Sequence, residues 1–245
     1  MVKLNYINKN FSEEHIVLYR QIDLQKTITK KKLYLILDLD QTLLHTITNV
    51  TNFDSDEMKQ IISKKTLQKN IFFVRDLHMV TKLRPFVFDF LKQANDLFEL
   101  YIYTMGTRDY AKVMARLIDP HGTLFGWRII SREDCTIPGK KGLDVVLADE
   151  KAILIVDDTI SVWSNHEKNL IKVDGFNFFG TGKDMEEIES KDDKLANVLC
   201  LLKKIHARFF DIEIDVTKVI DRDVRNYLKE IIDRDVRNNS NVPRM

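Results

Sequence analysis

The stretch that decides the fold is LYLILDLDQT at residues 33–42, in which five apolar residues are followed at once by alternating acids. A segment that is apolar on both faces is typical of a central strand in a parallel sheet. Residues i and i+2 at a strand end start on the same side of the sheet, so Asp38 and Asp40 can face one ligand. The stretch therefore predicts a buried strand that carries two functional carboxylates at its carboxyl end.

Two further apolar stretches also end in polar side chains. Residues 100–103 (LYIY) lead into Thr104, and residues 153–156 (ILIV) lead into Asp157 and Asp158. In open α/β sheets, ligands bind beyond the carboxyl ends of the strands. We therefore expect these side chains, which are distant in the sequence, to meet in one crevice.

The rest of the chain alternates strands with helices. We expect further strands at residues 127–130 and 170–173, helices that open at Pro85 and after Thr107, and an amphipathic helix over 192–210. Such alternation predicts an α/β fold with a Rossmann-like, mostly parallel central sheet flanked by helices.

Three segments are expected along the chain. Residues 1–29 form a polar N-terminal lead-in, residues 30–211 form the main domain, and residues 212–245 form a charged helical tail. Within the tail, the segment IDRDVRN that begins at Ile220 is repeated twelve residues later. Residues 45–80 are polar and irregular, and we expect them to be a small insertion in the domain.

Composition excludes several classes of protein. The chain has 245 residues, of which 44% are hydrophobic and 31% charged, and its 38 basic residues balance 37 acidic ones. These values are ordinary for a globular protein and do not favour direct nucleic-acid or membrane binding. No apolar run approaches the roughly 18 residues of a membrane span. We expect a monomer whose two cysteines form no disulfide framework.

The predicted crevice has the chemistry of a phosphate site. A lone pair of acids is common in solvated turns, but here each acidic or hydroxyl cluster follows a buried strand. Clustered carboxylates suit a hard cation such as Mg²⁺, and either Lys140 or Lys141 can supply a charge for a phosphate. One of the two carboxylates of Asp38 and Asp40 can attack phosphorus and form an aspartyl-phosphate. The other can protonate the leaving oxygen and then deprotonate water.

The motifs resemble the haloacid-dehalogenase superfamily, and more narrowly the Fcp/Scp-type phosphatases of the RNA polymerase II C-terminal domain. The resemblance runs from about residue 30 to about residue 210, and two segments match the plant C-terminal-domain phosphatase-like branch, WRIISREDC (127–135) and GLDVVL (142–147). The remaining motifs are DLDQTLLH (38–45), KLRPFVFDFL (82–91), YTMGTRDYA (103–111) and ILIVDDTISVW (153–163).

The resemblance implies a role for each matching residue. Asp38 would be the nucleophile, and Asp40 the general acid/base, with its backbone carbonyl on Mg²⁺. The hydroxyl of Thr104 and the backbone N–H of Met105 would bind a phosphoryl oxygen. Lys141 would neutralise the phosphoaspartate, although Lys140 is adjacent in the sequence.

The metal set implied in this way comprises Asp38, Asp40, Asp157 and Asp158. Asp158 would bind the ion directly, with Asp157 as its supporting partner near the lysine. Arg84 would bind substrate phosphate or brace the site.

The activity implied by the resemblance is that of a Mg²⁺-dependent protein serine/threonine phosphatase that works through an aspartyl-phosphate. Its partner would be the phosphorylated RNA polymerase II C-terminal domain or a similar phosphoprotein. Its subcellular location would be the nucleus, with the cytoplasm as an alternative. Two other functions stay open. The chain would be a small-molecule phosphatase if residues 45–80 form a cap, or a phosphopeptide-binding relic without turnover.

Overall fold

The fold is organised around β3 (Leu33–Leu37), whose five residues are all buried. The structure is a computed structural model that describes residues 2–4, 6, 9–48, 69–74, 77–180, 185–211 and 222–240. In the central sheet, β3 lies between β7 (Phe98–Tyr103) and β9 (Ile153–Asp157), and both neighbours run parallel to it. The predicted strands and the parallel α/β architecture are confirmed.

The register of the sheet brings three strand ends to the same level. Leu37 pairs with Ile102 on one side and with Val156 on the other. The sheet is completed by the edge strands β8 (Ile129–Ile130) and β10 (Leu170–Lys172), in the order β10-β9-β3-β7-β8. The residues that follow β3, β7 and β9 therefore emerge side by side.

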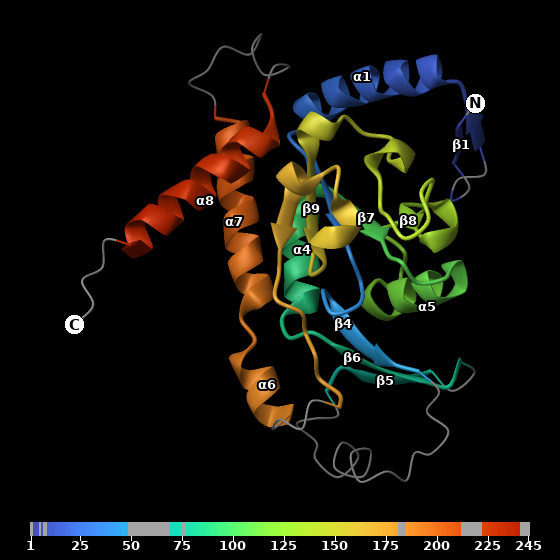
Figure 1. Cartoon of the computed structure of the whole chain (residues 1–245), viewed down its shortest axis with the longest axis vertical. Helices are drawn as coiled ribbons and strands as arrows, with labels where there is room; N and C mark the ends of the chain where they lie inside the picture. The colour runs from blue at the N-terminus through green and yellow to red at the C-terminus, as the bar shows by residue number, and fades with distance from the viewer. Residues whose placement is uncertain are drawn as a thin grey trace.

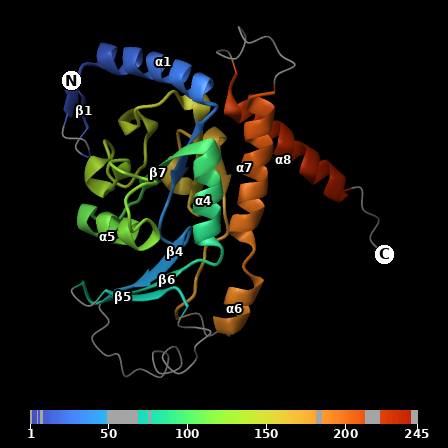
Figure 2. The same ribbon diagram turned by 180° about the vertical axis from the view of Figure 1, so that it is seen from behind.

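Helices follow the strands, as expected. The helix α5 (Arg108–Ile118) begins after Thr107, as predicted, and the side chain of Thr107 caps it by accepting a hydrogen bond from the Tyr110 N–H. The helix predicted at Pro85 is α4 (Val87–Leu97), which begins two residues later because Phe86 adopts a left-handed conformation. Figures 1 and 2 show α4 beside α7 (Lys194–Phe209), the amphipathic helix predicted over 192–210.

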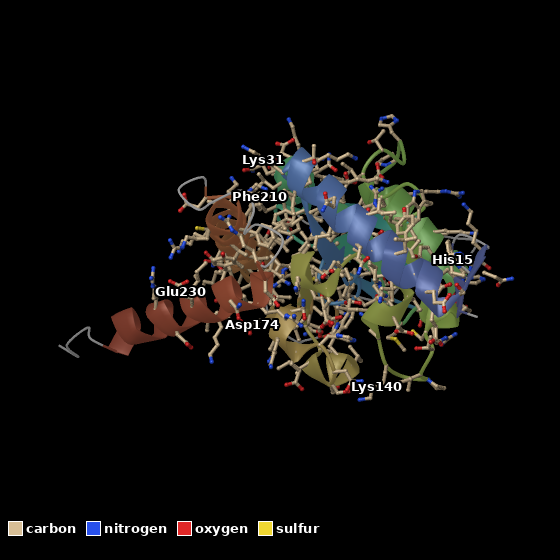
Figure 3. All side chains as sticks on the ribbon, turned by 90° about the horizontal axis from the view of Figure 1, so that it is seen from above. His15, Lys31, Lys140, Asp174, Phe210 and Glu230 are labelled. Atoms are coloured by element: carbon tan, nitrogen blue, oxygen red, sulfur yellow. The ribbon has the colours of Figure 1, made fainter. Side chains whose placement is uncertain are left out.

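The polar N-terminal segment contains regular structure that the sequence analysis did not assign. A short hairpin, β1 (Val2–Leu4) and β2 (Lys9–Phe11), precedes α1 (Glu13–Lys30). Seven of its eighteen residues are apolar, but four of these are exposed, and Ser12 caps the helix by accepting a hydrogen bond from the His15 N–H. Figures 1 and 3 show α1 across the end of the molecule where β3 begins.

The expectation that residues 45–80 are irregular is wrong where the structure describes them. They contribute to an antiparallel sheet of β4 (Leu44–Ile47), β6 (Met79–Leu83) and β5 (Ile71–Val74), at the end of the molecule opposite α1 (Figure 1). Two residues of β6 are polar although they are fully buried, so the sequence lacks the apolar pattern that is expected of a buried strand. Thr81 Oγ1 lies 2.9 Å from Thr46 Oγ1, and Lys82 Nζ lies 2.9 Å from Glu189 Oε2. Residues 49–68 lie outside the described residues.

The final described element is α8 (Val224–Ser240), which packs on α7 at its N-terminal end and then extends away from the body (Figure 2). The helix α6 (Met185–Lys191) lies before α7. Residues 212–221, with the start of the first repeat, lie outside the described residues, and the expected domain boundaries remain predictions. In the described part of the chain, no helix is both long and apolar enough to cross a membrane.

The packing of α8 predicts a specific loss of stability. Leu228 is buried against the core, whereas Ile232, one turn further along the same helix, is 43% exposed. We expect Leu228→Ala to lower the free energy of unfolding by about 2–4 kcal/mol, because it leaves a cavity. Urea unfolding monitored by circular dichroism measures the change, with Ile232→Ala as the matched control. Equal effects of the two substitutions would show that α8 does not pack as described.

Candidate active site

The carboxyl ends of β3, β7 and β9 open into one pocket of about 240 Å³. The convergence predicted from the sequence is therefore present in the structure. Ten residues line the pocket: Asp38, Asp40, Gln41, Thr104, Met105, Lys141, Asp157, Asp158, Thr159 and Val162.

Lys141 is the centre of this pocket. Its Nζ lies 2.6 Å from Asp38 Oδ1 and 2.6 Å from Asp157 Oδ2, and all three side chains are buried. Burial alone would lower the pKa of Lys141, but the two carboxylates outweigh burial and raise it. Lys141 is therefore a fixed cation between two anions.

The geometry separates Lys141 from its neighbour. The backbone N–H of Lys141 donates to Val162 O at 2.9 Å, which turns the side chain inward. Lys140 Nζ instead donates to Ser161 O at 2.6 Å, and Figure 3 shows Lys140 at the edge of the molecule. Only Lys141 of this pair lines the pocket with its side chain directed at the carboxylates.

Asp157 is held on both of its oxygens by the protein. Oδ1 accepts a hydrogen bond from the Thr159 N–H at 2.8 Å, and Oδ2 accepts one from Trp163 Nε1 at 2.8 Å as well as the one from Lys141. A carboxylate engaged in this way orients the lysine. These bonds agree with the supporting role expected for Asp157, which stays a prediction.

Electrostatics in the pocket are dominated by an excess of negative charge. Burial raises the pKa of Asp38 to about 7, with Lys141 opposing the rise and the neighbouring Asp157 adding to it. Burial also raises the pKa of Asp40 and of Asp158. Four carboxylates surround one ammonium group, so a further cation would stabilise the site.

The oxygen donors fit a divalent cation of the Mg²⁺ class. Asp38, Asp157 and Asp158 each offer a carboxylate oxygen, and these atoms lie within 4.8 Å of one another. Asp157 accepts three short hydrogen bonds, whereas Asp158 accepts only longer ones, from the hydroxyls of Thr42 at 3.4 Å and Thr159 at 3.1 Å. Asp38 and Asp158 are therefore the carboxylates more available to an ion. An all-oxygen set of this kind is what Mg²⁺ prefers in proteins.

Tyr110 is a residue of the site to which the sequence alone assigned no role. Its hydroxyl donates a short hydrogen bond to Asp40 Oδ1, and its oxygen lies 3.0 Å from Thr46 Oγ1. Gly106 makes room for the ring, since a Cβ there would lie 2.4 Å from Tyr110 Cδ1. One indication of this role was present in the sequence, which was the position of the tyrosine three residues after Thr107, the cap of the helix that follows β7.

Arg84, expected to bind substrate phosphate or to brace the site, is not among the residues that line the pocket. Arg84 is buried behind the pocket, where Nε donates to Asp192 Oδ1 at 3.0 Å and Nη2 donates to Asp174 O at 2.9 Å. Nη1 donates to Thr42 O at 3.0 Å, in the loop that follows Asp40. All three nitrogens of Arg84 are thus engaged, which favours the second of its two expected roles, although the role itself stays a prediction.

Comparison with known proteins gives a consistent result. Residues 33–213 match the family of NLI interacting factor-like phosphatases. The chain is 41% identical to the RNA polymerase II C-terminal domain phosphatase-like 4 of Arabidopsis thaliana, over 94% of this chain and 56% of that protein. It is 34% identical to the phosphatase-like 3 of the same plant, over 83% of this chain and 19% of that protein. The chain thus spans about half or less of these two relatives.

A solved structure shares the fold. The fission yeast RNA polymerase II CTD phosphatase Fcp1, bound to beryllium fluoride, superposes with a TM-score of 0.68 at 24% identity. The match covers 86% of this chain and 73% of the yeast chain.

The crowding of carboxylates predicts how stability depends on pH in the metal-free protein. The pKa of Asp38 is about 7 in the folded state, whereas an unfolded aspartate has a pKa of about 3.9. The folded state therefore retains this proton to higher pH, and stability falls as pH rises from about 4 to about 7. Asp38→Asn removes the ionisation, so we expect it to raise the melting temperature at pH 8 by a few degrees and by less at pH 5.

Calorimetry in EDTA at the two pH values measures this difference. Asp89→Asn removes the same charge from an exposed position on α4 and controls for net charge. Destabilisation by Asp38→Asn at pH 8 would show that the bond from Lys141 outweighs the repulsion among the carboxylates.

Proposed function

Because this chain belongs to the family of NLI interacting factor-like phosphatases, we propose that it is a Mg²⁺-dependent protein serine/threonine phosphatase. The observation that carries the proposal is the pairing of Lys141 with Asp38 at the bottom of an open pocket, 2.6 Å apart. A buried carboxylate paired with a lysine, with a second carboxylate two residues further on, is the arrangement that phosphoryl transfer to aspartate needs.

In the proposed reaction, Asp38 attacks the phosphorus of a phosphoserine and the bond to the serine oxygen breaks. Asp40 gives its proton to that oxygen as the serine leaves. Asp40 then takes a proton from water, which attacks the aspartyl-phosphate. Inorganic phosphate leaves and Asp38 is regenerated.

Three further groups hold the phosphoryl oxygens in this scheme. Lys141 neutralises their charge, and the Thr104 hydroxyl and the Met105 N–H donate hydrogen bonds. Asp38, Asp158 and the Asp40 carbonyl would hold Mg²⁺, which supplies charge stabilisation for the phosphoryl group when it is bound.

The substrate is proposed to be a phosphorylated polypeptide, the RNA polymerase II C-terminal domain in particular. The relatives carry that domain in their names. Within the described residues, the pocket lining includes none of β5 or β6, so that part of the insertion leaves the pocket open to a protein segment. The proposal also includes a nuclear location and a monomeric state.

The direct test is phosphate release from a C-terminal-domain phosphopeptide in Mg²⁺ and in EDTA. We expect release in Mg²⁺ only, and its loss in Asp38→Asn, which lacks the nucleophile. The two adjacent lysines supply a matched pair. We expect Lys141→Met to lower kcat/KM at least 100-fold, because removing one preorganised charge costs about 10²–10³ in rate, and Lys140→Met to leave it nearly unchanged.

Several results would contradict the proposal. Release that persists in Asp38→Asn would exclude the assigned nucleophile, and reversed effects of the two lysine variants would exclude the assigned lysine. Activity confined to sugar phosphates would favour a small-molecule phosphatase. Binding of the phosphopeptide without release would favour a relic.

The hydrogen bond from Tyr110 to Asp40 predicts an effect that depends on the leaving group. Asp40 must donate a proton to a serine oxygen, but a good aryl leaving group departs without one. If Tyr110 positions Asp40, Tyr110→Phe lowers kcat/KM about tenfold for a phosphoserine peptide and much less for an activated aryl phosphate. Stopped assays with both substrates measure the ratio, and an equal loss on both would show a structural role only.

A further inference from the structure

A second cavity, of about 210 Å³, lies at the amino end of the sheet, away from the catalytic pocket. Its walls come from α1, from the first residues of β3, from β7 and from the segment before β8. The residues that line it are Tyr19, Asp23, Lys26, Thr27, Lys30, Lys32, Tyr34, Glu99, Tyr101, Trp127, Arg128 and Leu147.

The cavity is aromatic in its floor and on one wall. Tyr34 and Tyr101 are buried and meet edge to face at 6.1 Å between ring centroids. Trp127 is 47% exposed, and it stacks on Tyr6 at 5.9 Å and meets Tyr101 edge-on at 6.1 Å. Aromatic surfaces fixed in this way bind the rings of proline or aromatic residues.

The rim of the cavity carries more positive than negative charge. Two acidic side chains line the cavity, Asp23 and Glu99, and both are already engaged. The four cationic side chains are those of Lys26, Lys30, Lys32 and Arg128. Asp23 accepts a hydrogen bond from the Tyr34 hydroxyl, and Glu99 lies 3.6 Å from Arg128.

Two of the four cations are available at the mouth of the cavity. Among the described residues, Lys26 and Lys30 have no hydrogen bond or ion pair, and both are exposed on α1, which faces the viewer in Figure 3. Lys32 instead donates to Asn95 O at 2.7 Å. Lys26 Nζ lies 6.0 Å from the centroid of the Tyr19 ring. The rim therefore offers two ammonium groups without a hydrogen bond beside an aromatic wall, which is complementary to a phosphate next to a ring-bearing residue.

We propose that this cavity docks a second phosphorylated segment of the peptide whose other phosphoserine enters the catalytic pocket. The inference rests on the proposed function and adds a docking site to it. A phosphopeptide fits better than a single-stranded nucleic acid, because the cavity is small and has carboxylates in its wall.

Strand length sets the spacing that such a peptide needs. Lys32 at the rim of the cavity and Asp38 in the catalytic pocket are six residues apart along the chain through β3, or about 20 Å at roughly 3.3 Å per residue. A peptide that travels over the surface must be longer than this direct path. Phosphoserines seven or more residues apart can reach both sites, whereas phosphoserines two residues apart, at most about 7 Å, cannot.

The test compares peptides with one phosphoserine, with two at a spacing of seven, and with two at a spacing of two. We expect the wild-type chain to show kcat/KM about tenfold higher for the widely spaced pair, since a tethered second site raises the local concentration. Lys26→Glu/Lys30→Glu abolishes this gain and leaves the single phosphopeptide unaffected. Lys203→Glu/Lys204→Glu makes the same charge change on an exposed part of α7 and preserves the gain.

A binding measurement separates failure of this inference from failure of the proposed function. In the Asp38→Asn background, fluorescence anisotropy follows binding of the labelled, widely spaced peptide. We expect Lys26→Glu/Lys30→Glu to weaken binding about tenfold. Hydrolysis without any dependence on these lysines would overturn the docking site alone. No hydrolysis, with lysine-dependent binding intact, would overturn the enzyme alone.

Two other outcomes would also overturn the docking site. One is an equal gain for the closely spaced peptide. The other is lysine-dependent binding of single-stranded RNA, such as an oligouridylate, with no such dependence for the peptide.

Discussion

The bond from the buried ammonium of Lys141 to Asp38 and Asp157 is the interaction on which the rest of the site depends. A buried charge is tolerated only when it is paired and hydrogen-bonded, so the strands must deliver both carboxylates to the same level. The pairing of Leu37 with Val156 does this. One ammonium group cannot neutralise four carboxylates, and the surplus charge gives the pocket its affinity for a cation.

A second constraint holds the loop that follows Asp40. Gln41 lies in the left-handed region with φ 62°, a conformation that is uncommon for residues other than glycine. Its carbonyl accepts a hydrogen bond from the Phe176 N–H at 2.7 Å, and Arg84 binds the next carbonyl. Since Arg84 also pairs with Asp192, just before α7, the loop is held by segments on two sides of it.

The sequence predicted the elements whose cause is local. Residues 33–37 are apolar on both faces, and Thr107 is a good helix cap, so the strand β3 and the start of the helix α5 were predicted correctly. It did not predict β6, because Thr81 and Lys82 are polar and their partners, Thr46 and Glu189, lie 35 and 107 residues away. Likewise, nothing local distinguishes Lys141 from Lys140 or shows that the Tyr110 hydroxyl reaches Asp40.

The parallel sheet gives the molecule two chemically different ends. Its carboxyl end gathers carboxylates around a small pocket that can recognise a phosphoryl group but has little surface for reading a sequence. Its amino end, under α1, gathers aromatic rings and lysines that take no part in the proposed reaction. Under the proposed two-site scheme, discrimination between phosphoproteins follows from how far apart their phosphates lie, because the length of the strands fixes the separation of the two pockets.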